Sequence, residues 1–279
     1  MPRFTTQDGL GLHFEEEGDG LPVLCLAGLT RNGGDFEFLM PHLDLAHVRA
    51  IRMDYRGRGQ SDHAADFMTY SILQEAQDAV ALLDHLGIER AAIIGTSRGG
   101  LIAMVLAGLH RDRLAGVVLN DIGPDIAQVG LARIMDYVGR APSFPDLDAA
   151  GHGLHALYEA DFPGVPVERW RRQAELMWYE KPGGGLGLRY DARLRNAMIA
   201  QAEAGPTPDL WPLFDQLATV PLCALRGANS DLLTPETLDR MQAHIPGMAA
   251  VTVADRAHVP FLDEPEAVAA IHALLEQAR

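Results

Sequence analysis

The sequence has few cysteines, few aromatic residues and fewer basic than acidic residues. Of its 279 residues, two are cysteines and 6% are aromatic, and 23 Lys and Arg stand against 38 Asp and Glu, giving a formal net charge of −15. Nucleic acids and anionic membrane surfaces need a basic face, so we expect neither as a partner. Cys25 and Cys223 each lie within an apolar run, which indicates small core residues rather than a disulfide or a metal pair.

Long hydrophobic runs are also missing. No segment approaches the ~18 apolar residues that a membrane span needs. The N-terminal stretch MPRFTTQDGLGLHF has no basic segment followed by an apolar one, as a leader peptide would. We therefore expect a soluble, cytoplasmic protein. Hydrophobic residues make up 48% of the chain, enough for the core of one large α/β domain.

Short β-rich runs alternate with longer helical patterns, which is typical of a mostly parallel sheet covered by helices. The pattern at 71–87 opens with a capping box and stops at a glycine, and the pattern at 263–279 opens with Asp, Pro and Glu; both predict helices. The predicted fold is thus α/β, with an eight-stranded sheet. The expected strands are residues 3–7, 10–18, 22–28, 47–54, 91–96, 114–121, 221–227 and 248–255.

Residues 122–215 break this alternation. They are rich in Gly, Pro, Trp and Arg, and they include the loop KPGGGLG. A long insertion after the sixth strand favours a helical cap over the strand ends, where α/β sheets place their sites. We expect residues 1–121 and 216–279 to form the core.

The segment Gly95-Thr96-Ser97-Arg98-Gly99 fits G-x-S-x-G between a predicted strand and a predicted helix. A strand that turns directly into a helix crowds the backbone, and flanking glycines relieve the crowding while the serine oxygen faces the cleft. Ser97 is therefore the expected nucleophile. Its oxyanion donors are expected to be the backbone N–H groups of Arg98 and of Leu29, in the loop after the third strand.

Serine needs a base, and the base needs a carboxylate to orient it. His258 follows the last predicted strand and is the expected base. Two acids follow earlier strands: Asp231 after the seventh and Asp121 after the sixth. The chain order Ser, Asp, His favours Asp231. Asp121, the alternative acid, is expected to pair with the Arg98 side chain and support the turn.

Five segments in order resemble the α/β-hydrolase superfamily across essentially the whole chain: LAGLTRNGGDF, MDYRGRGQSD, GTSRGG, RGANSDLLTPET and RAHVPFLDEP. The sequence is most similar to the serine branch of that superfamily, in which a cap shapes the pocket. This resemblance implies a triad of Ser97, His258 and Asp231. It also implies a carboxylesterase-like or lactonase-like enzyme without a cofactor.

Other charged groups have simpler interpretations. Asp54 and Arg56 lie in a stretch that lacks a Walker motif, and in similar proteins it is a structural turn. His152, His155 and Glu159 have helical spacing, but we interpret them as surface or pocket residues and expect no metal site.

The predicted reaction is hydrolysis of a medium-sized hydrophobic or aromatic ester or lactone. Trp170, Trp178 and Tyr179 are the candidate pocket residues, although packing in the core is an equally good interpretation. The sequence leaves the oligomeric state open.

Three alternative functions use the same fold. A hydrolase of carbon–carbon bonds in ring-fission diketones would need a polar group such as Arg172, Arg189 or Arg193. A cofactor-free perhydrolase or haloperoxidase is the second alternative. The third is a small-molecule receptor with slow turnover.

Overall fold

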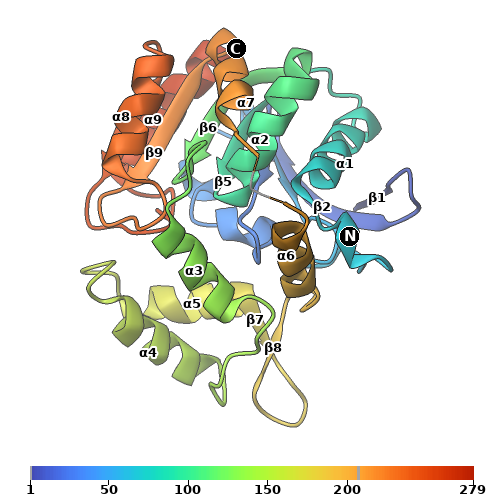
Figure 1. Ribbon diagram of the computed structural model, residues 1–279, viewed down its shortest axis with the longest axis vertical. Helices are drawn as coiled ribbons and strands as arrows, with labels where there is room; N and C mark the ends of the chain where they lie inside the picture. The colour runs from blue at the N-terminus through green and yellow to red at the C-terminus, as the bar shows by residue number, and fades with distance from the viewer. Residues whose placement is uncertain (1, 206–207) are drawn as a thin grey trace.

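The computed structural model describes residues 2–205 and 208–279, and its centre is an eight-stranded sheet (Figure 1). The strand order is β1-β2-β4-β3-β5-β6-β9-β10. β2 runs antiparallel to both of its neighbours, and the remaining pairs are parallel. All eight predicted strands are confirmed. Their bounds are Arg3–Thr5 (β1), Gly11–Gly18 (β2), Leu21–Leu26 (β3), Val48–Met53 (β4), Ala91–Thr96 (β5), Leu114–Asn120 (β6), Leu222–Gly227 (β9) and Ala249–Val253 (β10).

Each central strand buries both of its faces, which explains why the strands read as continuous apolar runs. In β3, Leu24 and Leu26 pack toward α1 (Ile72–His85) and α2 (Arg98–Leu109). Cys25 and the neighbouring Val23 point to the other face, toward α9 (Pro265–Ala278). Alternating residues thus contribute to two separate hydrophobic clusters.

The two cysteines belong to the second of these clusters. Cys25 and Cys223 are both free and fully buried, which confirms their interpretation as core residues. Burial in apolar surroundings raises the pKa of each thiol to about 12, so both thiols stay protonated and unreactive at neutral pH.

From α3 to α6, the chain between β6 and β9 forms a layer beside the sheet, here called the cap, whereas α7 lies next to α2 (Figure 1). The limits of the cap and core stay a prediction, because the last helix of the segment, α7, packs Trp211 and Phe214 into the main core. The glycine-rich loop is the turn of a small β7-β8 hairpin. The elements are α3 (Gln128–Tyr137), α4 (Leu147–Tyr158), α5 (Val167–Met177), β7 (Trp178–Glu180), β8 (Leu186–Leu188), α6 (Leu194–Glu203) and α7 (Trp211–Asp215).

One further helix, α8 (Pro235–His244), belongs to the core and lies between β9 and β10 in the chain. α1 begins as the capping pattern predicts, with the Ser71 hydroxyl accepting a hydrogen bond from the Gln74 N–H at 3.2 Å. None of the helices in the described ranges has the length and apolar character that a bilayer crossing requires.

Candidate active site

Ser97 lies at the corner between β5 and α2, with φ of +50° and ψ of −114°. A non-glycine residue in this region is strained, and such strain persists only where the surroundings enforce it. A Cβ on Gly95 would meet the Gly99 carbonyl carbon at 2.6 Å, and a Cβ on Gly99 would meet the Leu26 carbonyl oxygen at 1.9 Å. Both positions therefore require glycine, for the steric reason that the motif implies.

His258 lies between β10 and α9 and contacts both Ser97 and a carboxylate. Its Nε2 is 3.0 Å from Ser97 Oγ, and its Nδ1 is 2.8 Å from an Asp121 carboxylate oxygen. Asp121 is fully buried and also accepts hydrogen bonds from the Gly227 N–H at 2.8 Å and the Ser230 hydroxyl at 2.6 Å. The three side chains form a continuous chain of hydrogen bonds from acid to nucleophile.

The expectation that Asp231 lies beside His258 is wrong. Asp231 instead pairs with Arg133 of α3 at 3.0 Å. Both acids satisfy the chain order Ser, Asp, His, so chain order could not separate them. The strand order separates them. Because β6 lies next to β5, the residue that follows β6 lies beside the turn that carries Ser97.

The two predicted oxyanion donors come from two segments that adjoin Ser97. Leu29 follows Gly28, where an added Cβ would lie 3.9 Å from Ser97 Cβ, and Arg98 is the first residue of α2. Within the described residues, neither N–H donates to another protein group. Unpaired backbone donors beside a nucleophile are available to stabilise a developing oxyanion.

A buried ion network connects the segments that carry these two donors. Arg58 donates through Nε to the Leu29 carbonyl at 3.0 Å and lies 2.7 Å from one Glu75 carboxylate oxygen. The other Glu75 oxygen accepts from Arg98 Nε at 2.5 Å. The expected Arg98–Asp121 pair is therefore wrong, since Glu75 of α1 takes that position.

Sequence reasoning missed Glu75 and Arg58. A signal existed for Glu75, which lies with Asp78 among the apolar residues Ala76 and Ala79 on the buried part of α1. A carboxylate in such a position needs a buried cationic partner. The sequence does not show which arginine provides it.

The chain matches the family of the alpha/beta hydrolase fold over residues 22–265. The protein is a member of the α/β-hydrolase family. It is 34% identical over 271 residues to a 3-hydroxybutyrate-oligomer hydrolase of Cupriavidus necator, covering 93% of this chain and 92% of that protein.

Two solved structures are similar over nearly the full length of this α/β-hydrolase. One is an alpha/beta hydrolase from Novosphingobium aromaticivorans, with a TM-score of 0.91 and 44% identity, covering 99% of this chain and 97% of that chain. The other is E-2-(acetamidomethylene)succinate hydrolase, with a TM-score of 0.82 and 26% identity, covering 99% and 98% of the two chains. These matches agree with the predicted fold and family.

Two of the three aromatic candidates for the hydrolase's pocket, Trp170 and Trp178, pack inside the cap. Trp170 stacks on Tyr158 at a centroid distance of 5.2 Å and packs edge-on against Phe261 at 5.7 Å. Trp178 is buried in the same cluster, whereas Tyr179 is 44% exposed on the hairpin. Because Phe261 belongs to the loop after His258, this cluster attaches the cap to the segment that carries the base.

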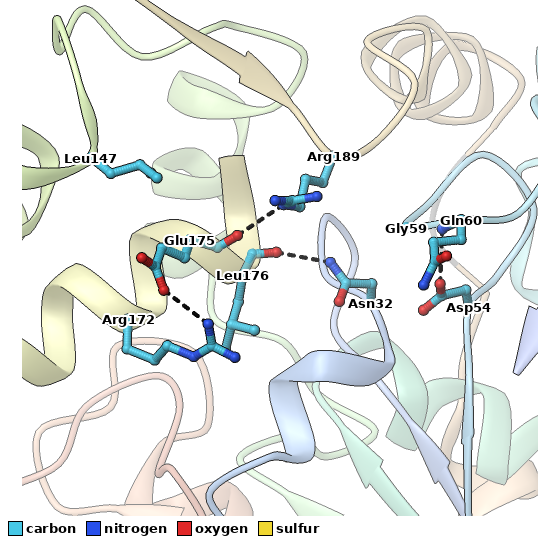
Figure 2. Close-up of a pocket in the computed structure, with 9 residues that line it drawn as sticks. All are labelled: Asn32, Asp54, Gly59, Gln60, Leu147, Arg172, Glu175, Leu176 and Arg189. Atoms are coloured by element: carbon cyan, nitrogen blue, oxygen red, sulfur yellow. Dashed lines mark hydrogen bonds and ion pairs between the residues drawn. The ribbon is translucent and has the colours of Figure 1, made fainter. Parts of the chain in front are cut away.

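A polar cavity of about 480 Å³ lies where the cap meets the core (Figure 2). The Asn32 amide, from the loop after β3, donates to the Leu176 carbonyl of α5 at 2.8 Å across this junction. The triad residues are not among the lining residues, so the cavity is distinct from the serine site. It is lined by Asn32, Asp54, Gly59, Gln60, Leu147, Arg172, Glu175, Leu176 and Arg189.

The remaining charged candidates have structural contacts in this hydrolase. Asp54 accepts from the N–H groups of Gly33 at 2.7 Å and Gln60 at 2.9 Å. Arg56 pairs with Asp78 at 2.7 Å and with Asp8 at 2.9 Å. Both therefore stabilise the turn after β4, as predicted.

The other candidate group is the trio with helical spacing in the cap: His152, His155 and Glu159. Across residues 2–205 and 208–279, no three His, Cys, Asp or Glu side chains gather in a way that could hold a metal ion.

Proposed function

We propose that this α/β-hydrolase cleaves carboxylic esters, including lactones, through an acyl-enzyme on Ser97. The observation that carries the proposal is the hydrogen-bonded chain from Asp121 through His258 to Ser97 Oγ, with distances of 2.8 and 3.0 Å. A serine becomes a useful nucleophile when a positioned base can accept its proton. This arrangement supplies that base, and a buried carboxylate holds it.

The proposed first step forms a bond between Ser97 Oγ and the ester carbonyl carbon while the hydroxyl proton moves to His258 Nε2. Asp121 stabilises the imidazolium ion through Nδ1. The Leu29 and Arg98 N–H groups stabilise the oxyanion of the tetrahedral intermediate. Collapse of that intermediate transfers the proton to the departing alcohol and leaves the acyl-enzyme.

In the second step, His258 takes a proton from water, and the resulting hydroxide attacks the acyl carbon. The free acid leaves, and Ser97 regains its proton from the imidazolium ion. The overall change is ester and water to acid and alcohol. No oxidant, metal or organic cofactor enters this sequence.

Short oligoesters of hydroxy acids are the substrates that we favour. The 34% identity to a 3-hydroxybutyrate-oligomer hydrolase over almost the whole chain supports this choice. The packing of Trp170 and Trp178 inside the cap removes the reason for preferring an aromatic substrate. A compact hydroxy-acid ester is therefore more consistent with the site than a large hydrophobic one.

The arginines considered for carbon–carbon bond cleavage have other partners. Arg172 pairs with Glu37 and Glu175, and Arg193 pairs with Asp191 at 2.7 Å. Arg189 donates to the carbonyls of Glu175 and Trp178. Because all three arginines have these partners, none of them is free to bind a dienoate. Ester hydrolysis is therefore the proposal that we favour.

The test compares wild type with Ser97→Ala on p-nitrophenyl esters from acetate to dodecanoate, a lactone, a ring-fission diketone and the 3-hydroxybutyrate dimer. We expect ester hydrolysis with a maximum at short acyl chains. Loss of the triad serine lowers kcat by about a million-fold in a comparable enzyme, so Ser97→Ala should be inactive. Ester hydrolysis that persists in Ser97→Ala, or turnover of the diketone alone, would contradict the proposal.

A further inference from the structure

Arg31 lies in the loop after β3, close to the proposed nucleophile. A Cβ added to Gly28 would be 3.4 Å from Arg31 Cγ and 3.9 Å from Ser97 Cβ. The Arg31 and Ser97 side chains therefore both lie next to Gly28. The Arg31 N–H donates to the Gly28 carbonyl at 3.1 Å, and this turn brings the side chain back toward Ser97.

The Arg31 guanidinium has only a long contact with its carboxylate. Its buried Nη1 lies 3.4 Å from an Asp35 oxygen and forms no hydrogen bond with any described residue. That oxygen already accepts from the Gln173 amide at 3.0 Å. By contrast, Arg56 makes close contacts with two carboxylates. A buried guanidinium donor with so weak a contact is incompletely satisfied, and an incoming anion would satisfy it.

Tyr137, at the end of α3 in the cap, lies within electrostatic reach of the same guanidinium. Burial raises the pKa of the Tyr137 phenol to about 12, while the positive charge of Arg31 acts in the opposite direction. Yet 43% of the residue is solvent-accessible. The Tyr137 phenol of the cap therefore feels the charge of Arg31 and remains accessible to solvent.

We propose that Arg31 binds a free carboxylate of the substrate, so that the preferred substrate is a hydroxy-acid ester whose acid end stays ionised. This inference rests on the proposed ester hydrolysis at Ser97. In an oligoester of a short hydroxy acid, the terminal carboxylate is only a few bonds from the last ester carbonyl. A cation beside the nucleophile can therefore hold one while Ser97 attacks the other, with the Tyr137 hydroxyl as a further donor.

The charges around Arg31 are consistent with an anion site. Asp35 is the carboxylate beside Arg31, and it already accepts from the Gln173 amide at 3.0 Å. The protein carries a net charge of −15, which repels anions at long range. A local guanidinium is thus what an anionic substrate would need in order to bind.

The experiment measures kcat/KM for the 3-hydroxybutyrate dimer and for the same dimer with a terminal carboxamide. The two substrates share the scissile ester and differ in charge. We expect wild type to prefer the acid at least tenfold. Because a hydrogen bond to a charged group contributes about a ten- to hundredfold effect, Arg31→Gln should lower the acid-to-amide ratio by that factor, and Arg31→Lys by less. Arg49→Gln, which breaks an Arg49–Glu16 pair between β4 and β2, is the matched control and should keep the wild-type ratio.

A second readout does not depend on turnover. Calorimetry with Ser97→Ala should show 3-hydroxybutyrate binding at least tenfold more tightly than its amide, and the added Arg31→Gln change should remove the difference. Equal losses on acid and amide in Arg31→Gln would make Arg31 structural and overturn the inference. Serine-dependent ester hydrolysis with no acid preference would also overturn it while leaving the proposed function intact. If no ester is hydrolysed, the proposed function fails and the calorimetry decides the role of Arg31.

Discussion

Asp121 has a backbone conformation that few non-glycine residues adopt, with φ of +56° directly after β6. This conformation turns the side chain back toward the sheet edge, where it is fully buried. Three donors surround the carboxylate: the Gly227 N–H, the Ser230 hydroxyl and His258 Nδ1. The loop after β9 therefore contributes to this hydrogen-bond network through Ser230 rather than through Asp231.

We predict that Asp121→Asn lowers kcat on p-nitrophenyl butyrate by about 10³- to 10⁴-fold, because the amide cannot hold His258 in the reactive tautomer. Asp231→Asn removes an exposed ion pair with Arg133 and is expected to change kcat less than tenfold. Steady-state kinetics of the two variants is the measurement. The opposite ranking would restore Asp231 as the acid.

At the scale of elements, α1 connects the two sides of the oxyanion site. Glu75 of α1 lies between Arg58, which donates to the Leu29 carbonyl, and Arg98, whose own N–H is the second proposed donor. Burial raises the pKa of Glu75, but the two guanidinium groups outweigh burial and hold this pKa below its usual range. The carboxylate thus stays ionised and keeps both arginines in place.

The prediction at this scale is that Glu75→Gln lowers kcat about ten- to hundredfold and changes KM less than threefold. Misplaced oxyanion donors weaken transition-state stabilisation more than substrate binding. Urea unfolding of the same variant checks that it folds, since breaking a buried ion pair costs about 3–5 kcal/mol.

If Glu75→Gln does not fold, Arg58→Lys tests the same network, because lysine keeps the charge but lacks the geometry to contact both Glu75 and the Leu29 carbonyl. It should show the same loss in kcat without a change in KM. A wild-type kcat in either folded variant would show that the network serves stability alone.

At the scale of the whole molecule, Asp191 connects the chain after β8 to the core. It accepts a hydrogen bond from the Tyr70 hydroxyl at 2.6 Å and pairs with Arg193 at 2.7 Å. Burial alone would raise the pKa of Asp191, but the hydrogen bonds from Arg193 and Tyr70 lower it to about 2, from an ordinary value of 3.8. This carboxylate therefore couples the cap to the core through its charged form.

The stabilisation by Asp191 should depend on pH. Because the folded pKa lies below the unfolded one, the contribution is fully present above pH 4 and is lost as pH falls through about 2. A shift of this size corresponds to about 2 kcal/mol. We expect Asp191→Asn to be less stable than wild type at pH 7 and the gap to narrow below pH 4, as measured by urea unfolding.

The control for this measurement is Asp148→Asn, which alters an exposed pair with Arg171 on the cap surface. This change should have little effect at any pH, because exposed pairs contribute about 0–1 kcal/mol. A gap between wild type and Asp191→Asn that stays constant from pH 7 to pH 2.5 would contradict the prediction.

Local features of this chain could be predicted because their causes are local. The strands appear as apolar runs, since the central ones are buried on both faces. Ser97 could be identified because glycines on either side of a strand-to-helix corner are a steric necessity. His258 could be placed because it lies between the last strand and the last helix.

Other features depend on which elements become neighbours. Asp121 and Asp231 each follow a strand in the sequence, and only the β5-β6-β9 order brings Asp121 to His258. Trp170 has the same side chain whether it lines a pocket or packs on Phe261, and only the folded cap decides between them.

The sequence by itself thus determined the α/β fold and predicted Ser97 and His258 as nucleophile and base, because backbone sterics and burial patterns act over short stretches. Only the tertiary structure brought Asp121 to His258, formed the Glu75 network and set the environment of Arg31. Each of these depends on side chains from distant segments meeting in the interior, where an ion pair or hydrogen bond forms only between groups that the fold has brought within contact distance.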